Sequence, residues 1–120
     1  MDGEKKELIR KATEKIGKPD VIIELFTMHF VYASDKLSKL VNLKHEEIVD
    51  HRVTDVVIID KAIIVNEISK VLSRSKSEVK CFKTKSGYDI EVKIKMASFT
   101  HNAEPYIAAH IISSNKRKSK

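Results

Sequence analysis

A regular alternation of apolar and charged residues between positions 88 and 99 constrains this fold more than any other feature of the sequence. Successive side chains of a β-strand point to opposite faces, so the pattern predicts a strand with one buried and one solvated face. Such a strand is typical of an antiparallel sheet, because the strands of a parallel sheet are covered on both faces. The alternating residues are Ile90, Glu91, Val92, Lys93, Ile94, Lys95 and Met96.

Four further segments are predicted to be strands of the same sheet. Residues 78–84 precede a turn at 85–87, and residues 105–112 are apolar or small at almost every position, which predicts a central strand. Nearer the N-terminus, residues 21–26 and 29–33 are rich in β-branched and aromatic side chains, and the connection between them is tight. We therefore expect a five-stranded sheet.

The N-terminal segment has the pattern of an amphipathic helix. Apolar residues recur at the helical period over 3–17, and Gly17 followed by Pro19 ends the pattern. An apolar stripe of this kind must cover either the chain's own sheet or a partner chain. The stripe consists of Leu8, Ile9, Ala12 and Ile16.

Helices also fill the block between the second and third predicted strands. Ser34 is a candidate N-cap, and Asn42 is a candidate stop because asparagine tolerates the left-handed conformation. We expect a helical turn at 45–49 and a longer helix at 61–73. Strands and helices that occur in runs indicate the α+β class, here with helices on one face of the sheet.

The length of 120 residues fits a single domain. We expect an N-terminal helix at 1–18, a domain at 19–114 and a basic tail at 115–120. The formal net charge of +6 comes mostly from that tail, and a short basic end is usually a solvated terminus, which disfavours nucleic-acid binding. The basic residues of the tail are Lys116, Arg117, Lys118 and Lys120.

Cysteine usage and hydropathy suggest a cytoplasmic location. The single cysteine, Cys81, excludes an internal disulfide and fits a reducing compartment. The first residues are too polar for a secretory signal, and no segment approaches the ~20 apolar residues of a membrane span.

Three motifs in a fixed order resemble those of a known family. Residues 30–49 read FVYASDKLSKLVNLKHEEIV, residues 83–92 read KTKSGYDIEV, and residues 104–106 read EPY. A strand, a helix with its stop, a Glu-Glu run, a basic hairpin and a turn into the last strand are similar to the pattern of the PAS family. The resemblance covers about residues 20–115 and implies a sensor or interaction module.

The sequence departs from the family pattern at several turns. Thr27 and Met28 stand where the family often has an Asp-x-x-Gly turn, Ser34 replaces a frequent Asn, and Asn42 replaces a helix-ending Gly. Residues 113–115 are Ser-Ser-Asn, where many sensor PAS domains have Asp-Ile-Thr. Because that triplet commonly couples the last strand to a following helix, relay through the C-terminus is disfavoured.

The resemblance implies a sheet packed against helices, often around a small cavity that binds haem, flavin or another metabolite. The same residues are also expected as ordinary core, and that alternative stays open. The candidate lining residues are Phe30, Tyr32, Leu37, Leu40, Ile64, Ile68, Cys81, Ile94 and Met96.

Two cofactors of the family are disfavoured. Haem in this family commonly takes a His on the long helix, and residues 61–76 contain none, although His110 lies in an apolar strand. Covalent flavin uses a Cys within Asn-Cys-Arg-Phe-Leu, whereas Cys81 lies in a predicted strand. The identity of any ligand stays open.

We therefore expect a regulatory PAS sensor in signal transduction rather than an enzyme, either standing alone or as part of a kinase or regulator. It would bind a small ligand, form a homodimer through the N-terminal helix (Leu8, Ile9, Ala12, Ile16) and the sheet, or do both. The alternatives are a ligand-free interaction domain and, in another class, a small nucleic-acid-binding protein. The catalytic motifs with glycine-rich loops or paired histidines do not occur in the sequence.

Overall fold

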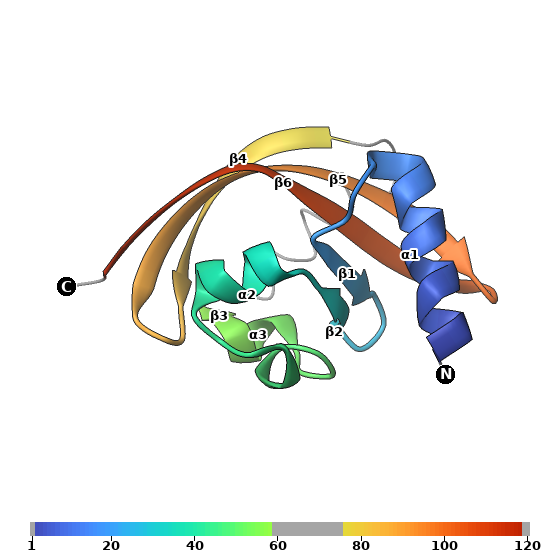
Figure 1. Ribbon diagram of the computed structural model, residues 1–120, viewed down its shortest axis with the longest axis horizontal. Coiled ribbons are helices and arrows are strands. Elements are labelled where there is room, and N and C mark those ends of the chain that lie inside the picture. The colour runs from blue at the N-terminus through green and yellow to red at the C-terminus, as the bar shows by residue number, and fades with distance from the viewer. Residues whose placement is uncertain (1, 59–75, 119–120) are drawn as a thin grey trace.

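A computed structural model describes residues 2–58 and 76–118 of the chain. Within them lies one antiparallel sheet with the strand order β2-β1-β6-β5-β4-β3 (Figure 1). The expected helix at 61–73 lies outside the described residues. The strands are β1 (Val21–Glu24), β2 (His29–Ala33), β3 (Val57–Ile58), β4 (Lys76–Thr84), β5 (Tyr88–His101) and β6 (Glu104–Lys118).

The sheet has six strands where the sequence predicted five. The additional strand is β3, which pairs with β4 through Val57 opposite Thr84 and Ile58 opposite Lys83. Two residues are too few to show any periodicity, so no pattern could have indicated this strand. The α+β class and the antiparallel sheet are confirmed.

The last strand runs past the expected end at residue 112. Strand β6 stays paired with β5 as far as Lys118, which lies opposite Tyr88. Its final residues are polar and exposed, so they carry no hydrophobic pattern. Backbone pairing does not require apolar side chains, and the long strand β5 supplies the partner. Most of the predicted basic tail is therefore part of the sheet.

Four helical elements accompany the sheet, namely α1 (Asp2–Ile16), α2 (Asp35–Val41), the 3₁₀ turn η1 (His45–Glu47) and α3 (Val53–Val56). In Figure 1 the sheet curves over α2 and α3, whereas α1 lies apart from them, near the other end of the sheet. The expectation of helices on one face holds for α2, η1 and α3, because the side chains that α1 contacts lie on the opposite face.

The predicted ends of α2 are confirmed by geometry. The Ser34 side chain accepts a hydrogen bond from the backbone N–H of Leu37 at 3.2 Å, which makes it the N-cap. Asn42 ends the helix with φ 58°, in the left-handed region that asparagine tolerates. Gly17 ends α1 in the same region, with φ 79°, and its N–H bonds to the carbonyl of Thr13 at 2.9 Å.

The first hairpin replaces the family's Asp-x-x-Gly turn with a different arrangement. The carboxylate of Glu24 accepts hydrogen bonds from the N–H of Phe26 and the hydroxyl of Thr27. Met28 takes the left-handed conformation with φ 60°, where glycine would be free of strain. The side chain of Glu24 thus organises the turn.

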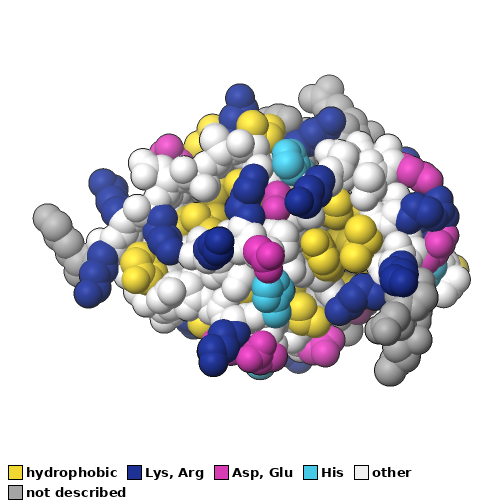
Figure 2. Space-filling view, in the orientation of Figure 1, with side chains coloured by type: hydrophobic (Ala, Val, Ile, Leu, Met, Phe, Trp, Pro, Cys, Tyr) yellow, Lys and Arg dark blue, Asp and Glu magenta, His cyan; other side chains and the backbone are white. Residues whose placement is uncertain are grey.

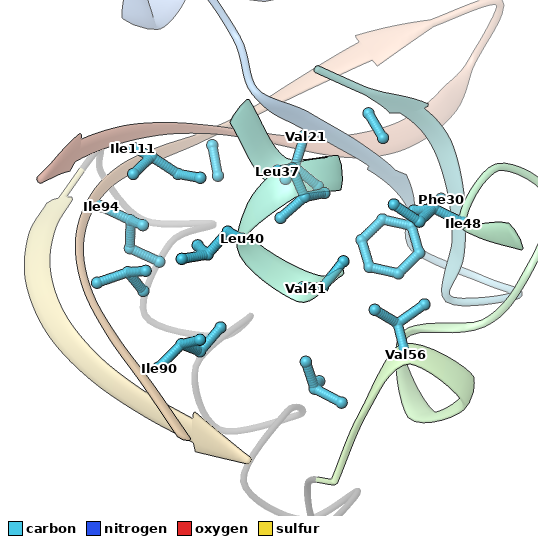
Figure 3. Packing of buried hydrophobic residues seen from close by; sticks show 14 residues of the cluster. Val21, Phe30, Leu37, Leu40, Val41, Ile48, Val56, Ile90, Ile94 and Ile111 are labelled. Carbon is cyan, nitrogen blue, oxygen red and sulfur yellow. The ribbon is translucent and has the colours of Figure 1, made fainter. Parts of the chain in front are cut away.

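A large apolar cluster, called the inner cluster below, fills the concave side of the sheet. Side chains from β5 meet those of α2, β2 and α3 and that of Ile48, which directly follows η1 (Figure 3). Its buried residues are Val21, Phe30, Ala33, Leu37, Leu40, Val41, Ile48, Val56, Val57, Ile90, Val92, Ile94, Ala109 and Ile111.

A second cluster, the outer cluster, joins α1 to the other face of the sheet. Three of the four residues of the predicted apolar stripe are buried in it, and Ile9 packs at its edge. The rings of Phe99 and Tyr106 stack within it, with centroids 5.5 Å apart. The stripe of α1 therefore covers the chain's own sheet. The buried residues are Leu8, Ala12, Ile16, Ile22, Ala97, Phe99, Tyr106 and Ala108.

Candidate functional site

Five of the nine candidate lining residues lie together on the inner face. Phe30, Leu37, Leu40 and Ile94 are buried in the inner cluster, and Met96 packs against it. Ile64 and Ile68 lie outside the described residues. The predicted lining and the hydrophobic core are thus made by the same side chains on this face.

Tyr32 lies on the other face of the sheet from Phe30. A β-bulge interrupts the pairing of β1 with β2: Ile22 lies opposite Tyr32 and Ile23 opposite Phe30, which leaves Val31 as the extra residue. An extra residue reverses the alternation of side chains beyond it, so Tyr32 packs against the outer cluster. Regular alternation would place both aromatic residues on one face, and the bulge interrupts it here.

Cys81 also lies away from the inner cluster. It pairs with Glu91 on the outer face and is exposed, while its neighbour Phe82 packs against the inner cluster. The thiol is 3.9 Å from the carboxylate of Glu91. Because the sheet separates it from the inner cluster, Cys81 does not fit the role of a thiol that attacks a flavin bound there.

A polar cleft of about 420 Å³ opens on the molecular surface beside β2 and α2. Figure 2 shows lysine, histidine and acidic side chains gathered near the middle of this face. The cleft brings together the N-terminal helix, the linker after it, the first hairpin, α2 and β6. Its lining residues are Lys5, Lys18, Asp20, Tyr32, Ala33, Ser34, Asp35, Lys36, His45, Val49 and His110.

Asp20 is the buried polar centre of this cleft, with 3% of its surface exposed. One carboxylate oxygen accepts a hydrogen bond from the Ser34 hydroxyl at 2.6 Å, and the other accepts one from the Ile111 N–H at 2.7 Å. His110 Nδ1 lies 3.3 Å from the same carboxylate and 2.8 Å from the carbonyl oxygen of Lys18. Asp20 therefore ties β1 to β6 and to the N-cap of α2.

Ser34, His110 and Asp20 do not form a nucleophilic triad. The hydroxyl of Ser34 donates to Asp20 and accepts from the Leu37 N–H, so its oxygen is committed as a helix cap. A nucleophilic serine instead needs its proton directed to a histidine. The three side chains hold the structure together.

The phenol of Tyr32 lies in a setting that disfavours its ionised form. Partial burial raises its pKa above the usual value, and the nearby carboxylates of Asp20 and Asp35 raise it further. Tyr32 therefore remains a neutral hydrogen-bond donor at the wall of the cleft.

Three of the described histidines have their contacts outside the inner cluster. His110 bonds to Lys18 at the cleft, His101 is near Tyr106 of the outer cluster, and His45 pairs with Asp35 at 3.2 Å. Over the described residues, no group of three or more His, Cys, Asp or Glu side chains could hold a metal ion. The described helices also include none that is long and apolar enough to cross a bilayer.

Sequence reasoning missed the cleft because its members are distant in the chain. Asp20 and Ile111 are 91 positions apart, and no local pattern links them. The available hint was an aspartate placed directly before a buried strand, where an isolated charge needs partners. His110 lies in the predicted apolar strand, and its Nδ1 bonds to the Lys18 carbonyl.

No protein-family model matches the sequence, and no curated protein matches it. Solved structures do. The PAS domain of an HTR-like protein from Haloarcula marismortui matches with TM-score 0.59 at 11% identity, over 92% of this chain and 96% of that one. The PAS domain of nitrogen regulation protein NR(II) from Vibrio parahaemolyticus matches with TM-score 0.57 at 14% identity, over 82% and 85%.

A LOV protein from Rhodobacter sphaeroides matches with TM-score 0.60 at 12% identity, over 94% of this chain and 69% of that one. At such identities the likeness establishes the fold alone. The chain has a PAS-domain fold, as its motifs predicted.

Proposed function

We propose that this chain is the sensory module of a cytoplasmic signalling protein and that it acts by binding rather than by catalysis. The observation that carries the proposal is the PAS fold, with an inner cluster on one sheet face and a separate helix docked on the other. The structural neighbours include PAS domains of a sensor histidine kinase and of a nitrogen regulation protein. Because α1 packs on the sheet through its own cluster, a conformational change in the sheet could shift this helix and so transmit a signal.

In this proposal the inner face is the place for a small-molecule ligand. The residues for it are Phe30, Leu37, Leu40, Ile94 and Met96, which converge between the sheet and α2. Native mass spectrometry and an absorption spectrum of freshly purified protein test the idea. A co-purified molecule supports the sensor, whereas bare protein together with a completely filled core in a crystal structure supports the ligand-free interaction domain.

Haem and covalent flavin stay disfavoured within this proposal. Cys81 is exposed on the outer face, and His45, His101 and His110 have their contacts outside the inner cluster. The same absorption spectrum checks both points. A Soret band, or a flavin band that bleaches reversibly in blue light, would overturn this part.

We also propose homodimerisation through α1 and the sheet. Leu8, Ala12 and Ile16 are already buried against the chain's own sheet, so the contact would use the flank of α1 and the uncovered part of the outer face. That part carries Val79, which is 59% exposed opposite Lys93. A second copy placed on this surface would cover the exposed side chain of Val79.

Light scattering tests the dimer with the full chain and with a version that starts at Lys18. If both are monomeric at tens of micromolar, dimerisation through this helix is wrong. Val79→Glu is expected to dissociate the dimer. Phe26→Glu is the matched control, because Phe26 is 78% exposed on the first hairpin and not on β4.

Nucleic-acid binding remains the alternative from another class, and the basic end offers it little support. The ammonium of Lys116 donates to the Lys39 carbonyl at 2.7 Å and lies 4.7 Å above the ring of Tyr88. Arg117 pairs along the sheet with Asp89. Retention on generic DNA or RNA at low salt, lost as salt rises, would favour this alternative.

A further inference from the structure

The polar cleft around Asp20 gathers positive charge from three separate segments. Lys5 comes from α1, Lys18 from the linker after it, and Lys36 from the first turn of α2. Three lysines face two aspartates, so the lining carries one net positive charge when both histidines are neutral. Several charges that converge on one cleft attract a counter-ion more strongly than isolated surface charges do.

The two acidic residues of the cleft already have partners. The carboxylate of Asp20 receives the Ser34 hydroxyl and the Ile111 N–H, and Asp35 lies 3.2 Å from His45. By contrast, the side-chain ammonium groups of Lys5 and Lys18 have no hydrogen-bond or ion-pair partner within the part of the chain that the structure describes. The cleft therefore presents cations whose charge the protein does not itself neutralise.

One neutral group supplements these cations. Tyr32 adds a phenol O–H at the wall of the cleft. The Nδ1 of His110 is already used by its bond to the Lys18 carbonyl, which fixes the orientation of the ring. Ammonium groups together with a phenol O–H are donors suited to carboxylate or phosphate oxygens.

We propose that this cleft binds a small dianion, a dicarboxylate or a phosphate, between Lys5, Lys18 and Lys36. The cleft lies on the surface beside β2 and α2, so the proposal does not depend on a ligand at the inner face. Its success or failure is therefore separate from that of the proposed function.

The bound anion also stabilises the docked position of α1. Lys5 belongs to α1, whereas Lys18 and Lys36 lie on the linker and on α2. An anion held between them favours the docked helix, because a ligand that binds only one conformation stabilises that conformation. The cleft thus couples a small metabolite to the position of the N-terminal helix.

The test is an NMR titration of the full chain with succinate and, separately, with inorganic phosphate, against potassium chloride at equal ionic strength. We expect saturable shifts of cleft amides with a dissociation constant of ~1 mM for at least one dianion. Amide hydrogen exchange in α1 is expected to slow in the presence of that dianion. The dianion with the lower dissociation constant identifies carboxylate or phosphate as the preferred ligand chemistry.

Matched variants separate a built site from general charge attraction. Lys18→Gln and Lys5→Gln are each expected to weaken binding at least fivefold, and Lys5→Gln should abolish the slowing of exchange in α1. Lys39→Gln removes the same charge from an exposed position of α2 outside the cleft, and it should change binding by less than twofold. All three positions are exposed, so the variants are expected to fold.

Two results would overturn the proposal. One is the absence of saturable shifts with either dianion up to 50-fold above ~1 mM. The other is equal weakening by Lys39→Gln and Lys18→Gln, which would reduce the effect to net charge.

Discussion

The two faces of the sheet are built differently. The inner cluster draws its buried side chains from strands, from α2 and α3, and from Ile48 directly after η1, and it includes large residues such as Phe30 and Ile48. The outer cluster depends on one helix, and three of its buried residues are alanines, namely Ala12, Ala97 and Ala108. Small side chains let α1 approach the sheet closely but bury little apolar area. The comparison suggests a firm inner core and a helix that can be released.

Phe30→Ala should have the largest effect, because it removes a buried aromatic ring from the inner cluster. Deletion of a buried aromatic ring leaves a cavity and lowers the free energy of unfolding by about 3–5 kcal/mol. Urea unfolding followed by far-UV circular dichroism measures this loss. A loss below about 1 kcal/mol would mean that the inner cluster does not hold the fold together.

Ala12→Asp attacks the outer cluster in the same way. Ala12 is completely buried, and a carboxylate there would lie unpaired against the sheet. We expect a loss of about 2–3 kcal/mol, limited by the fact that α1 can leave the sheet while the inner cluster persists. Thr13→Asp, at the exposed neighbouring position, is the control and should cost less than about 0.5 kcal/mol. If Ala12→Asp unfolds the whole chain, the two faces are not separable.

Asp20→Asn tests the polar connection between the two regions. The aspartate accepts hydrogen bonds from Ser34 and Ile111, and an amide has only one oxygen to offer. The expected loss is about 1–2 kcal/mol by urea unfolding. Glu46→Gln, at an exposed position of η1, serves as the control. If Asp20→Asn left the free energy of unfolding unchanged, these hydrogen bonds would not stabilise the contact between the two regions.

The smallest expected effect is a pH dependence that originates at Tyr32. Its pKa is raised in the folded protein, mainly by burial, so above the usual value of 10.0 the folded state holds its proton longer than the unfolded state. Stability from this group is therefore fully present below pH 10.0 and declines as pH rises through the higher folded pKa. Tyr32→Phe should lessen the fall in unfolding free energy at alkaline pH. An identical pH profile in both proteins would contradict this assignment.

Local patterns in the sequence predicted the elements that local physics controls. The alternation over Ile90–Ile94 predicted β5, the hydroxyl of Ser34 predicted the start of α2, and Asn42 predicted its end. Each of these depends on neighbours within a few residues, which a sequence shows directly. The amphipathic stripe likewise predicted α1, although not which surface it covers.

Features that depend on distant pairing escaped prediction. The extra residue Val31 reverses the side chains of β2 and moves Tyr32 to the outer cluster, and only the pairing with β1 reveals it. The cleft needs Asp20 and His110 side by side, which only the adjacency of β1 and β6 brings about. Tertiary contacts determine both the orientation of Tyr32 and the position of the cleft, and the local periodicity of the sequence contains no information on either.

Native-state hydrogen exchange, resolved residue by residue, tests most directly whether the two faces are independent. We predict that the amides of α1 exchange through an opening of lower free energy than those of β5, and that Ala12→Asp removes protection from α1 while leaving β5 protected. A single opening free energy shared by α1 and β5 would contradict the account, because the helix would then be an inseparable part of the inner core.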